Sequence, residues 1–184
     1  MVTEKNSKEG DIRAIEWIEE IRHGGNVKRC HNFPIIGEQR VSAHTWGVLV
    51  IADKLYPDYL DSHLMRAITY HDVPEYITGD IPKNAKWRSP DIAAGQDLLH
   101  NEVLDQLGLV FKLDIQQHRV MKICDGIELM YFCMEQRLLG NRYVDRVFGK
   151  IRNHLKYNTL GLDENAKELI DQLTEKYGEI YAQK

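Results

Sequence analysis

Residues Ala67–Asp80 read AITYHDVPEYITGD and place an imidazole, His71, beside a carboxylate, Asp72, where a helix is predicted to end. Adjacent side chains normally leave a helix in different directions. Pro74 disfavours helical backbone in the residue before it, so both side chains are free to turn toward one point. An imidazole nitrogen with a carboxylate oxygen suits a divalent metal such as Zn, Mn, Co or Fe. A lone His-Asp pair is more often a solvated helix end, so the metal hypothesis needs further ligands from elsewhere.

The whole chain has 184 residues, which fits a single domain, 1–184, with a sizeable core. Its formal net charge of -4 offers no basic surface for a nucleic-acid polymer. Three cysteines, two of them in an apolar helical run, are typical of reduced thiols in a cytoplasmic compartment. The polar first residues do not resemble a signal peptide, and no apolar run is long enough to cross a bilayer. We therefore expect a cytoplasmic protein without a membrane partner.

Apolar residues recur at spacings of three and four along most of the chain, the period of an amphipathic helix. No stretch shows convincing strand alternation. The predicted fold is therefore all-α, a bundle of about six or seven helices. The predicted helices cover 11–23, 42–55, 62–71, 90–107, 114–138, 143–155 and 166–181, with irregular segments at 26–40 and 75–90.

Local signals predict where several of these helices begin and end. Gly24-Gly25 should end the first helix, because glycine commonly follows the last helical residue. Side-chain oxygens that can cap the first turn are expected at Ser42, at Asp61 or Ser62, and at Asp163.

Three of the predicted helices carry a potential metal ligand on their apolar side. His44 shares a face with Val48 and Ile51, and His71 continues the apolar face of its own helix. Asp125 lies among core residues, where an ionised carboxylate requires a cation or strong hydrogen bonds. The alternatives are core histidines with hydrogen-bonded ring nitrogens and a structural Arg or Lys beside the carboxylate. Two inward histidines on separate helices nevertheless favour a shared ligand.

The ordered set His44, His71-Asp72 and Asp125 resembles the HD superfamily of metal-dependent phosphohydrolases, which is named after the His-Asp pair. The closer resemblance is to the YfbR-like 5′-deoxynucleotidase branch and related phage deoxynucleotide hydrolases. It implies an HD-domain helical bundle. The resemblance spans residues 29–125 and rests on Arg29, Ser42-Ala43-His44, His71-Asp72-Val73-Pro74-Glu75, Thr78-Gly79-Asp80-Ile81-Pro82 and Asp125.

The resemblance implies that His44, His71, Asp72 and Asp125 bind one divalent metal, with Co, Mn, Zn and Fe as the candidates. Four nitrogen and oxygen ligands leave positions for a water and a phosphate oxygen on a five- or six-coordinate ion. Such an ion lowers the pKa of the bound water and polarises the phosphorus–oxygen bond.

The resemblance also implies roles for residues around the metal. Glu75 is expected to act as general acid or base, with Asp80 as a second candidate or a sugar contact. Arg29 matches a phosphate-binding arginine, whose forked guanidinium can hold two phosphate oxygens. Lys83 and Lys86 match the substrate loop, and the alternative for both is an ordinary solvated loop lysine.

One position departs from the branch. Cys30 follows Arg29 where a tryptophan otherwise shapes the sugar–base pocket, so the base and sugar preference stays open. The implied reaction releases phosphate from deoxynucleoside 5′-monophosphates. The alternative, known among phage members, is a deoxynucleoside triphosphohydrolase that converts dATP to deoxyadenosine and triphosphate. Its extra phosphates would need Arg29, Lys83, Lys86 and Arg88.

Two non-enzymatic interpretations stand beside these reactions. One is a catalytically silent nucleotide-binding module, and the other is a helical bundle whose polar residues satisfy one another. The presence of every expected ligand and of Glu75 favours the enzyme. The family resemblance further implies a homodimer or larger homo-oligomer, and a host-cytoplasm location if the chain is phage-encoded.

Overall fold

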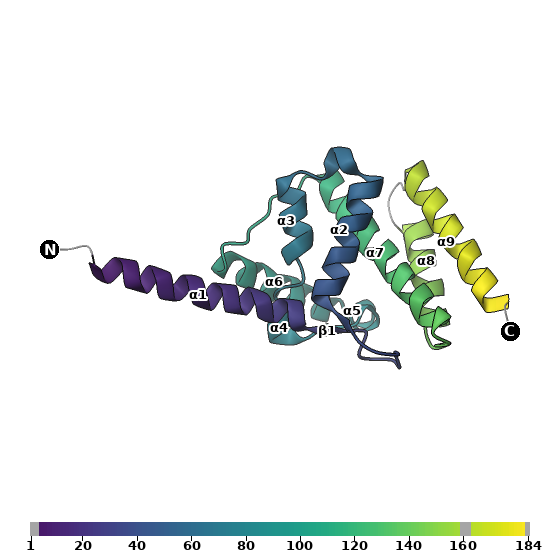
Figure 1. The fold of residues 1–184 in the computed structure, drawn as a ribbon, viewed down its shortest axis with the longest axis horizontal. Coiled ribbons are helices and arrows are strands. Elements are labelled where there is room, and N and C mark those ends of the chain that lie inside the picture. Colours follow the sequence, from purple (N-terminus) through teal and green to yellow (C-terminus); the bar gives the residue numbers. More distant parts are fainter. Residues whose placement is uncertain (1–3, 159–162, 183–184) are drawn as a thin grey trace.

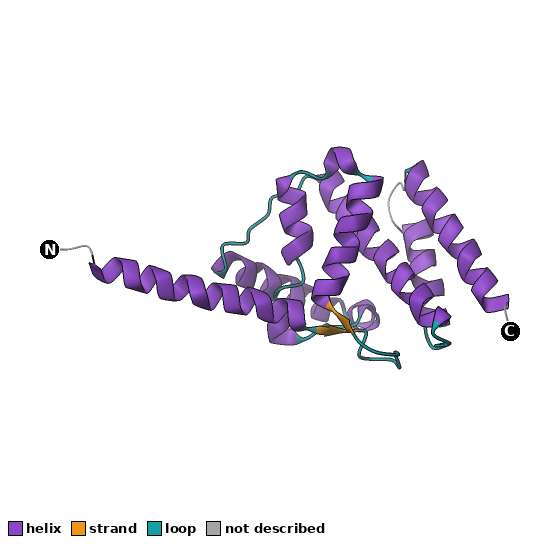
Figure 2. Ribbon diagram, in the orientation of Figure 1, coloured by secondary structure: helices purple, strands orange, loops and turns teal. Residues whose placement is uncertain are grey.

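The computed structural model describes residues 4–158 and 163–182 and is built almost entirely of helices (Figure 2). Seven helices in these ranges have nine or more residues, so the predicted all-α bundle of six or seven helices is confirmed. The helices are α1 Glu4–Asn26, α2 Val41–Leu55, α3 Ser62–Tyr70, α4 Glu75–Thr78, α5 Lys83–Arg88, α6 Pro90–Gln106, α7 Ile115–Leu138, α8 Asp145–Asn158 and α9 Glu164–Ala182, with a 3-10 turn at Pro57–Tyr59.

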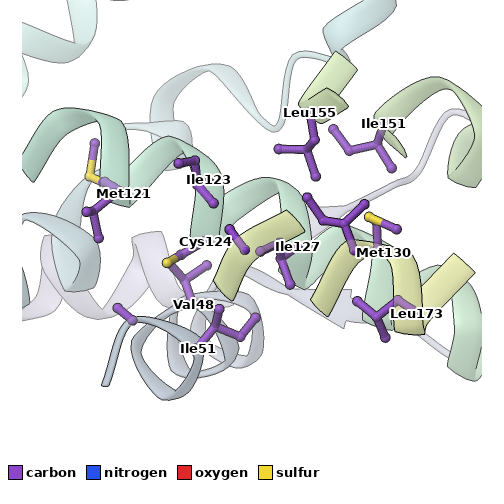
Figure 3. Packing of buried hydrophobic residues seen from close by; sticks show 14 of the residues in the cluster. Val48, Ile51, Met121, Ile123, Cys124, Ile127, Met130, Ile151, Leu155 and Leu173 are labelled. Atoms are coloured by element: carbon purple, nitrogen blue, oxygen red, sulfur yellow. The ribbon is translucent and has the colours of Figure 1, made fainter. Parts of the chain in front are cut away.

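Helix α7 is the centre of the fold, with α2 on one side and the α8–α9 pair on the other (Figure 1). Ile127 of α7 is completely buried, and Val48 of α2 and Leu155 of α8 belong to the same apolar cluster (Figure 3). Full burial of one such side chain contributes about 1.5–3 kcal/mol to folding. This packing holds α7, and with it Asp125, in a fixed position relative to α2.

Side-chain caps begin three of the helices. Asp61 accepts a hydrogen bond from the backbone N–H of Leu64 (2.8 Å), which confirms the predicted start of α3. Asp163 accepts one from Ala166 at the start of α9, as predicted. Asp114 begins α7 with a capping box that also uses Gln117.

The predicted end of the first helix at Gly24-Gly25 is wrong, because α1 continues to Asn26. At Gly24 the helix touches the turn that precedes α4. A Cβ there would lie 2.7 Å from both the Cα and the carbonyl oxygen of Val73. Glycine is therefore needed for the close approach of two backbones, and this tertiary contact overrides the local signal.

Two further boundaries differ from the prediction. Ser42 does not cap α2, which starts at Val41 directly after Arg40 and has no side-chain cap. The segment 75–90, predicted to be irregular, contains the short helices α4 and α5. Helices of four and six residues are too short to show a period in the sequence.

The structure also contains two very short strands outside the predicted helices. β1, Lys28–Arg29, pairs antiparallel with β2, Gln39–Arg40, and the pairing sets Arg29 opposite Gln39. Two residues cannot display alternation. This pair of strands places Arg29 close to the start of α2.

Helix α1 projects from the rest of the protein (Figure 1). Ile15, Trp17 and Ile18 on it are exposed. No helix in the described part of the chain combines the length and apolar character needed to cross a membrane. All three cysteines are buried free thiols, as expected.

Candidate active site

Three separate elements bring the expected metal ligands together. His44 comes from α2, His71 and Asp72 follow the end of α3, and Asp125 comes from α7. The His44 Nε2 atom lies 3.2 Å from Oδ1 of Asp125 and 3.7 Å from Oδ2 of Asp72. His71 Nε2 lies 3.2 Å from Oδ1 of Asp72. His44, His71 and Asp125 each offer a ligand atom within 4.8 Å of the others, so this group can hold a metal ion.

The hydrogen bonds of the two imidazoles are compatible with metal binding, because each uses only the Nδ1 atom. His71 Nδ1 lies 2.8 Å from the carbonyl oxygen of Ile68, and this oxygen can only accept, so the ring proton is on Nδ1. His44 Nδ1 likewise lies 2.5 Å from Glu128, while its buried Nε2 has no hydrogen-bond partner among the described residues. Both rings therefore turn Nε2 toward the carboxylates. With Nε2 deprotonated on both rings, these nitrogens and the carboxylate oxygens form a donor set that suits a divalent cation.

The pKa shifts show that cationic and anionic groups stabilise each other's charge at this site. Burial and Arg29 lower the pKa of His44, but the carboxylates of Asp125 and Glu128 outweigh them and raise it to about 9. Burial would raise the pKa of Asp72, but the charges of His71 and Arg29 lower it to about 2. The pKa of Asp125 is likewise held well below its usual range, because Lys83 and His44 outweigh its burial. Both aspartates therefore stay ionised at neutral pH.

Strand β1 brings Arg29 directly to these carboxylates. Its guanidinium forms an ion pair with Asp72, and Nη2 lies 3.9 Å from Asp125. Burial lowers the pKa of Arg29, but the charges of Asp72 and Asp125 more than compensate and raise it. Arg29 is therefore a buried, permanently charged group beside the cluster of candidate ligands.

Glu75, the first residue of α4, lies beside the same cluster. The side chain is buried, and its Oε2 has no hydrogen-bond partner in the described part of the chain. Burial and the charge of Asp72 raise the pKa of Glu75 to about 9. A carboxyl group that keeps its proton at neutral pH can serve as a proton donor.

Asp80 has a different environment from Glu75. It accepts a hydrogen bond from the backbone N–H of Cys30 (3.0 Å), and Cys30 has a positive φ of 57°. Few non-glycine residues adopt this left-handed conformation. Asp80 thus holds the turn that follows Arg29. Burial raises the pKa of the Cys30 thiol to about 12, so this thiol is not a nucleophile at neutral pH.

A cavity of about 450 Å³ opens beside the ligand cluster. It is lined by Arg29, Cys30, Glu75, Asp80, Lys83 and Lys86, so the structure gathers these expected site residues around one space. Lys83 Nζ lies 3.0 Å from Oδ2 of Asp125. The cavity also has a second wall made by α7 and α8, with the cations Lys122, Arg146 and Lys150 beside Tyr143 and Val147.

The sequence did not reveal this second wall or Glu128. Nothing local indicates that α8 lines the same cavity as Lys83, so Arg146 and Lys150 could not be found from spacing. Glu128 was detectable, because it lies three residues after Asp125 within a core helix and therefore on the same helical face.

Comparison with known proteins identifies the family. A family profile described as 5′-deoxynucleotidase, YfbR-like, matches residues 16–170. The chain belongs to the YfbR-like family. The profile covers every expected site residue of this YfbR-like protein, from Arg29 to Asp125, and continues through α8 into α9. Comparison with curated proteins finds no significant match.

Solved structures share the fold of this YfbR-like chain. The cyanophage S-2L HD phosphohydrolase DatZ, solved with dA and one catalytic Zn²⁺ bound, is 16% identical with a TM-score of 0.66, covering 88% of this chain and 96% of DatZ. The PH0347 protein of Pyrococcus horikoshii is 17% identical with a TM-score of 0.68, covering 88% and 99%. An HD-domain phosphohydrolase of Listeria innocua is 16% identical with a TM-score of 0.56, covering 90% and 98%. The YfbR-like chain therefore has the HD-domain fold.

Proposed function

We propose that this protein is a metal-dependent phosphohydrolase that releases phosphate from deoxynucleoside 5′-monophosphates. The observation that carries the proposal is the convergence of His44 Nε2, His71 Nε2 and the Asp125 carboxylate beside a buried arginine and a cavity. Membership of the YfbR-like family supports the same reaction.

His44, His71, Asp72 and Asp125 would hold one divalent ion, with Co, Mn, Zn and Fe as the candidates. When bound, this ion supplies an activated water and polarises the phosphate ester. DatZ, solved with one catalytic Zn²⁺ bound, supports a single-ion site in this chain.

The protein's own groups bind the phosphate and move a proton. Arg29 binds phosphate oxygens through its fork of N–H donors, and Lys83 and Lys86 add positive charge to the same cavity. Glu75 is the general acid or base, because its buried carboxyl group keeps a transferable proton at neutral pH. Asp80 positions the Arg29–Cys30 turn and is the second candidate for proton transfer.

The cavity lining favours a second candidate, a deoxynucleoside triphosphohydrolase that converts dATP to deoxyadenosine and triphosphate. A monophosphate needs few cations, whereas a triphosphate benefits from a larger set. Seven cationic residues line the described cavity, namely Arg29, Lys83, Lys86, Arg88, Lys122, Arg146 and Lys150. Both candidates use the same ligand cluster, so products must separate them.

The test is a product-resolved assay with added Co²⁺, Mn²⁺ or Zn²⁺. The protein is given dAMP, AMP and dATP in parallel, and orthophosphate, pyrophosphate and triphosphate are separated by ion chromatography. Orthophosphate from dAMP and none from AMP is the expected result. Triphosphate from dATP would establish the second candidate. No product with any metal would overturn both and leave a silent nucleotide-binding module.

Three expectations stay predictions: a single domain over 1–184, a cytoplasmic location, and a homodimer or larger homo-oligomer without nucleic-acid partners.

A further inference from the structure

We propose that Glu128 is the residue that positions His44 for metal binding. The inference rests on the proposed metal site but concerns a side chain outside its ligand set. Glu128 lies on α7, one helical turn beyond Asp125, and is buried with 8% of its surface exposed. It therefore needs partners for both carboxylate oxygens, and it has them.

The first oxygen fixes the imidazole of His44. Oε2 of Glu128 lies 2.5 Å from His44 Nδ1. A carboxylate acceptor at Nδ1 keeps the ring proton there and leaves the lone pair on Nε2. The same contact sets the rotation of the ring, so that Nε2 faces Asp125 at 3.2 Å. Without Glu128, neither the tautomer nor the ring orientation would be held.

The second oxygen anchors Glu128 to the strand pair. Oε1 accepts a hydrogen bond from Nε2 of Gln39 (2.9 Å), a buried residue of β2 that pairs with Arg29 of β1. The carboxylate of Glu128 is thus held from the side opposite His44. Through Gln39 it also links β2, the partner strand of Arg29, to the helix that carries His44.

Helix α2 leaves room for this carboxylate. Gly47 lies three residues after His44 on the same face, and a Cβ there would lie 2.8 Å from Cγ of Glu128. Any side chain at this position would displace Glu128 from His44. Gly47 and Glu128 therefore depend on each other, which gives a second, independent way to disturb the same contact.

The direct test is Glu128→Gln, which keeps the shape of the side chain. An amide is a weaker acceptor than a carboxylate, and it cannot accept from both His44 and Gln39 through two oxygens. The affinity of the folded, metal-free protein for Co²⁺ is measured by competition with a chelator. We expect it to fall about 10–100-fold, the usual cost of losing such a supporting contact. The matched control is Glu135→Gln, which removes an exposed carboxylate from the same helix and should bind Co²⁺ as the wild type does.

The second test is Gly47→Ala, with Gly149→Ala as its control. A Cβ at Gly149 would meet no atom within 4 Å, so that substitution adds a helical alanine and nothing else. We expect Gly47→Ala to weaken Co²⁺ binding and Gly149→Ala to leave it unchanged. Far-UV circular dichroism of each metal-free variant confirms that binding is compared between folded proteins.

Wild-type Co²⁺ affinity in both Glu128→Gln and Gly47→Ala would overturn the inference and leave the metal site intact. A purely structural role for Glu128 predicts this result, because it would lower stability without changing the affinity of the folded form. Failure of the wild type itself to bind Co²⁺ would instead overturn the proposed metal site, and with it this inference.

Discussion

At the residue scale, both carboxylate oxygens of Asp72 lie close to nitrogen atoms of other site residues. One of its oxygens pairs with Arg29 and the other faces His71 Nε2 at 3.2 Å. Removing this carboxylate takes away a proposed metal ligand and leaves the buried guanidinium of Arg29 with a weaker partner. The two losses act on the same site.

We therefore expect Asp72→Ala to lose metal retention and turnover together. Metal content by inductively coupled plasma mass spectrometry and phosphate release from dAMP would be measured on one preparation. Asp53→Ala, on the exposed side of α2, is the control and should keep both. Full activity in purified Asp72→Ala would show that the ligand assignment is wrong.

Glu75 should behave differently, because its proposed role is to move a proton rather than to hold the metal. Glu75→Gln keeps the size and neutrality of the protonated carboxyl group but cannot donate an acidic proton. We expect the metal content to be unchanged and kcat to fall about 10²–10⁴-fold. If the variant purified without metal, Glu75 would be a metal ligand, and its assignment as the general acid or base would be wrong.

The sequence pointed to the candidate ligands because each has a local signal. His71 and Asp72 precede a proline, His44 lies on an apolar helical face, and Asp125 is an acid in a core run. The structure brings His44, His71 and Asp125 within reach of one ion, with Asp72 beside them. Arg146 had no such local signal, because its position in the cavity depends on how α8 packs.

At the element scale, the turn between α3 and α4 carries His71 and Asp72 and leads into Glu75, the first residue of α4. Helix α1 packs directly on this turn at Gly24. Gly24-Gly25 was expected to end α1, which is the usual local meaning of such a pair. Here the glycine instead permits contact with Val73. Cap positions such as Asp61 were predictable because the cap and its partner lie within one turn.

Gly24→Ala should therefore destabilise the protein, although alanine is normally the better helical residue by about 0.5–1 kcal/mol. Its Cβ would meet the backbone of Val73, which cannot move aside as a flexible side chain can. We expect the free energy of unfolding to fall by about 1–3 kcal/mol in urea denaturation. Gly149→Ala, with open space around its Cβ, should be neutral or stabilising. A Gly24→Ala protein as stable as the wild type would rule out the close contact.

At the scale of the whole molecule, the proposed ion would join three parts of the chain that are distant in sequence. Its ligands come from α2, from the end of α3 and from α7, so the bound ion requires the folded arrangement of all three. The unfolded chain lacks this arrangement. A ligand that binds only the folded state stabilises it by mass action.

Metal should therefore raise the thermal unfolding midpoint, and a chelator should reverse the effect. At a free metal concentration about 100 times Kd, the gain is about 2.7 kcal/mol. Differential scanning calorimetry would compare the wild type with Asp125→Ala. An equal rise in both proteins would mean that the metal binds elsewhere.

The most direct measurement of the central claim is phosphate release from dAMP by metal-free protein titrated with Co²⁺. We expect no activity without metal, then a rise in proportion to added Co²⁺ that stops at one equivalent per chain. Hydrolysis by the metal-free protein, or a rise that continues well beyond one equivalent, would contradict a phosphohydrolase built on a single ion held by His44, His71, Asp72 and Asp125.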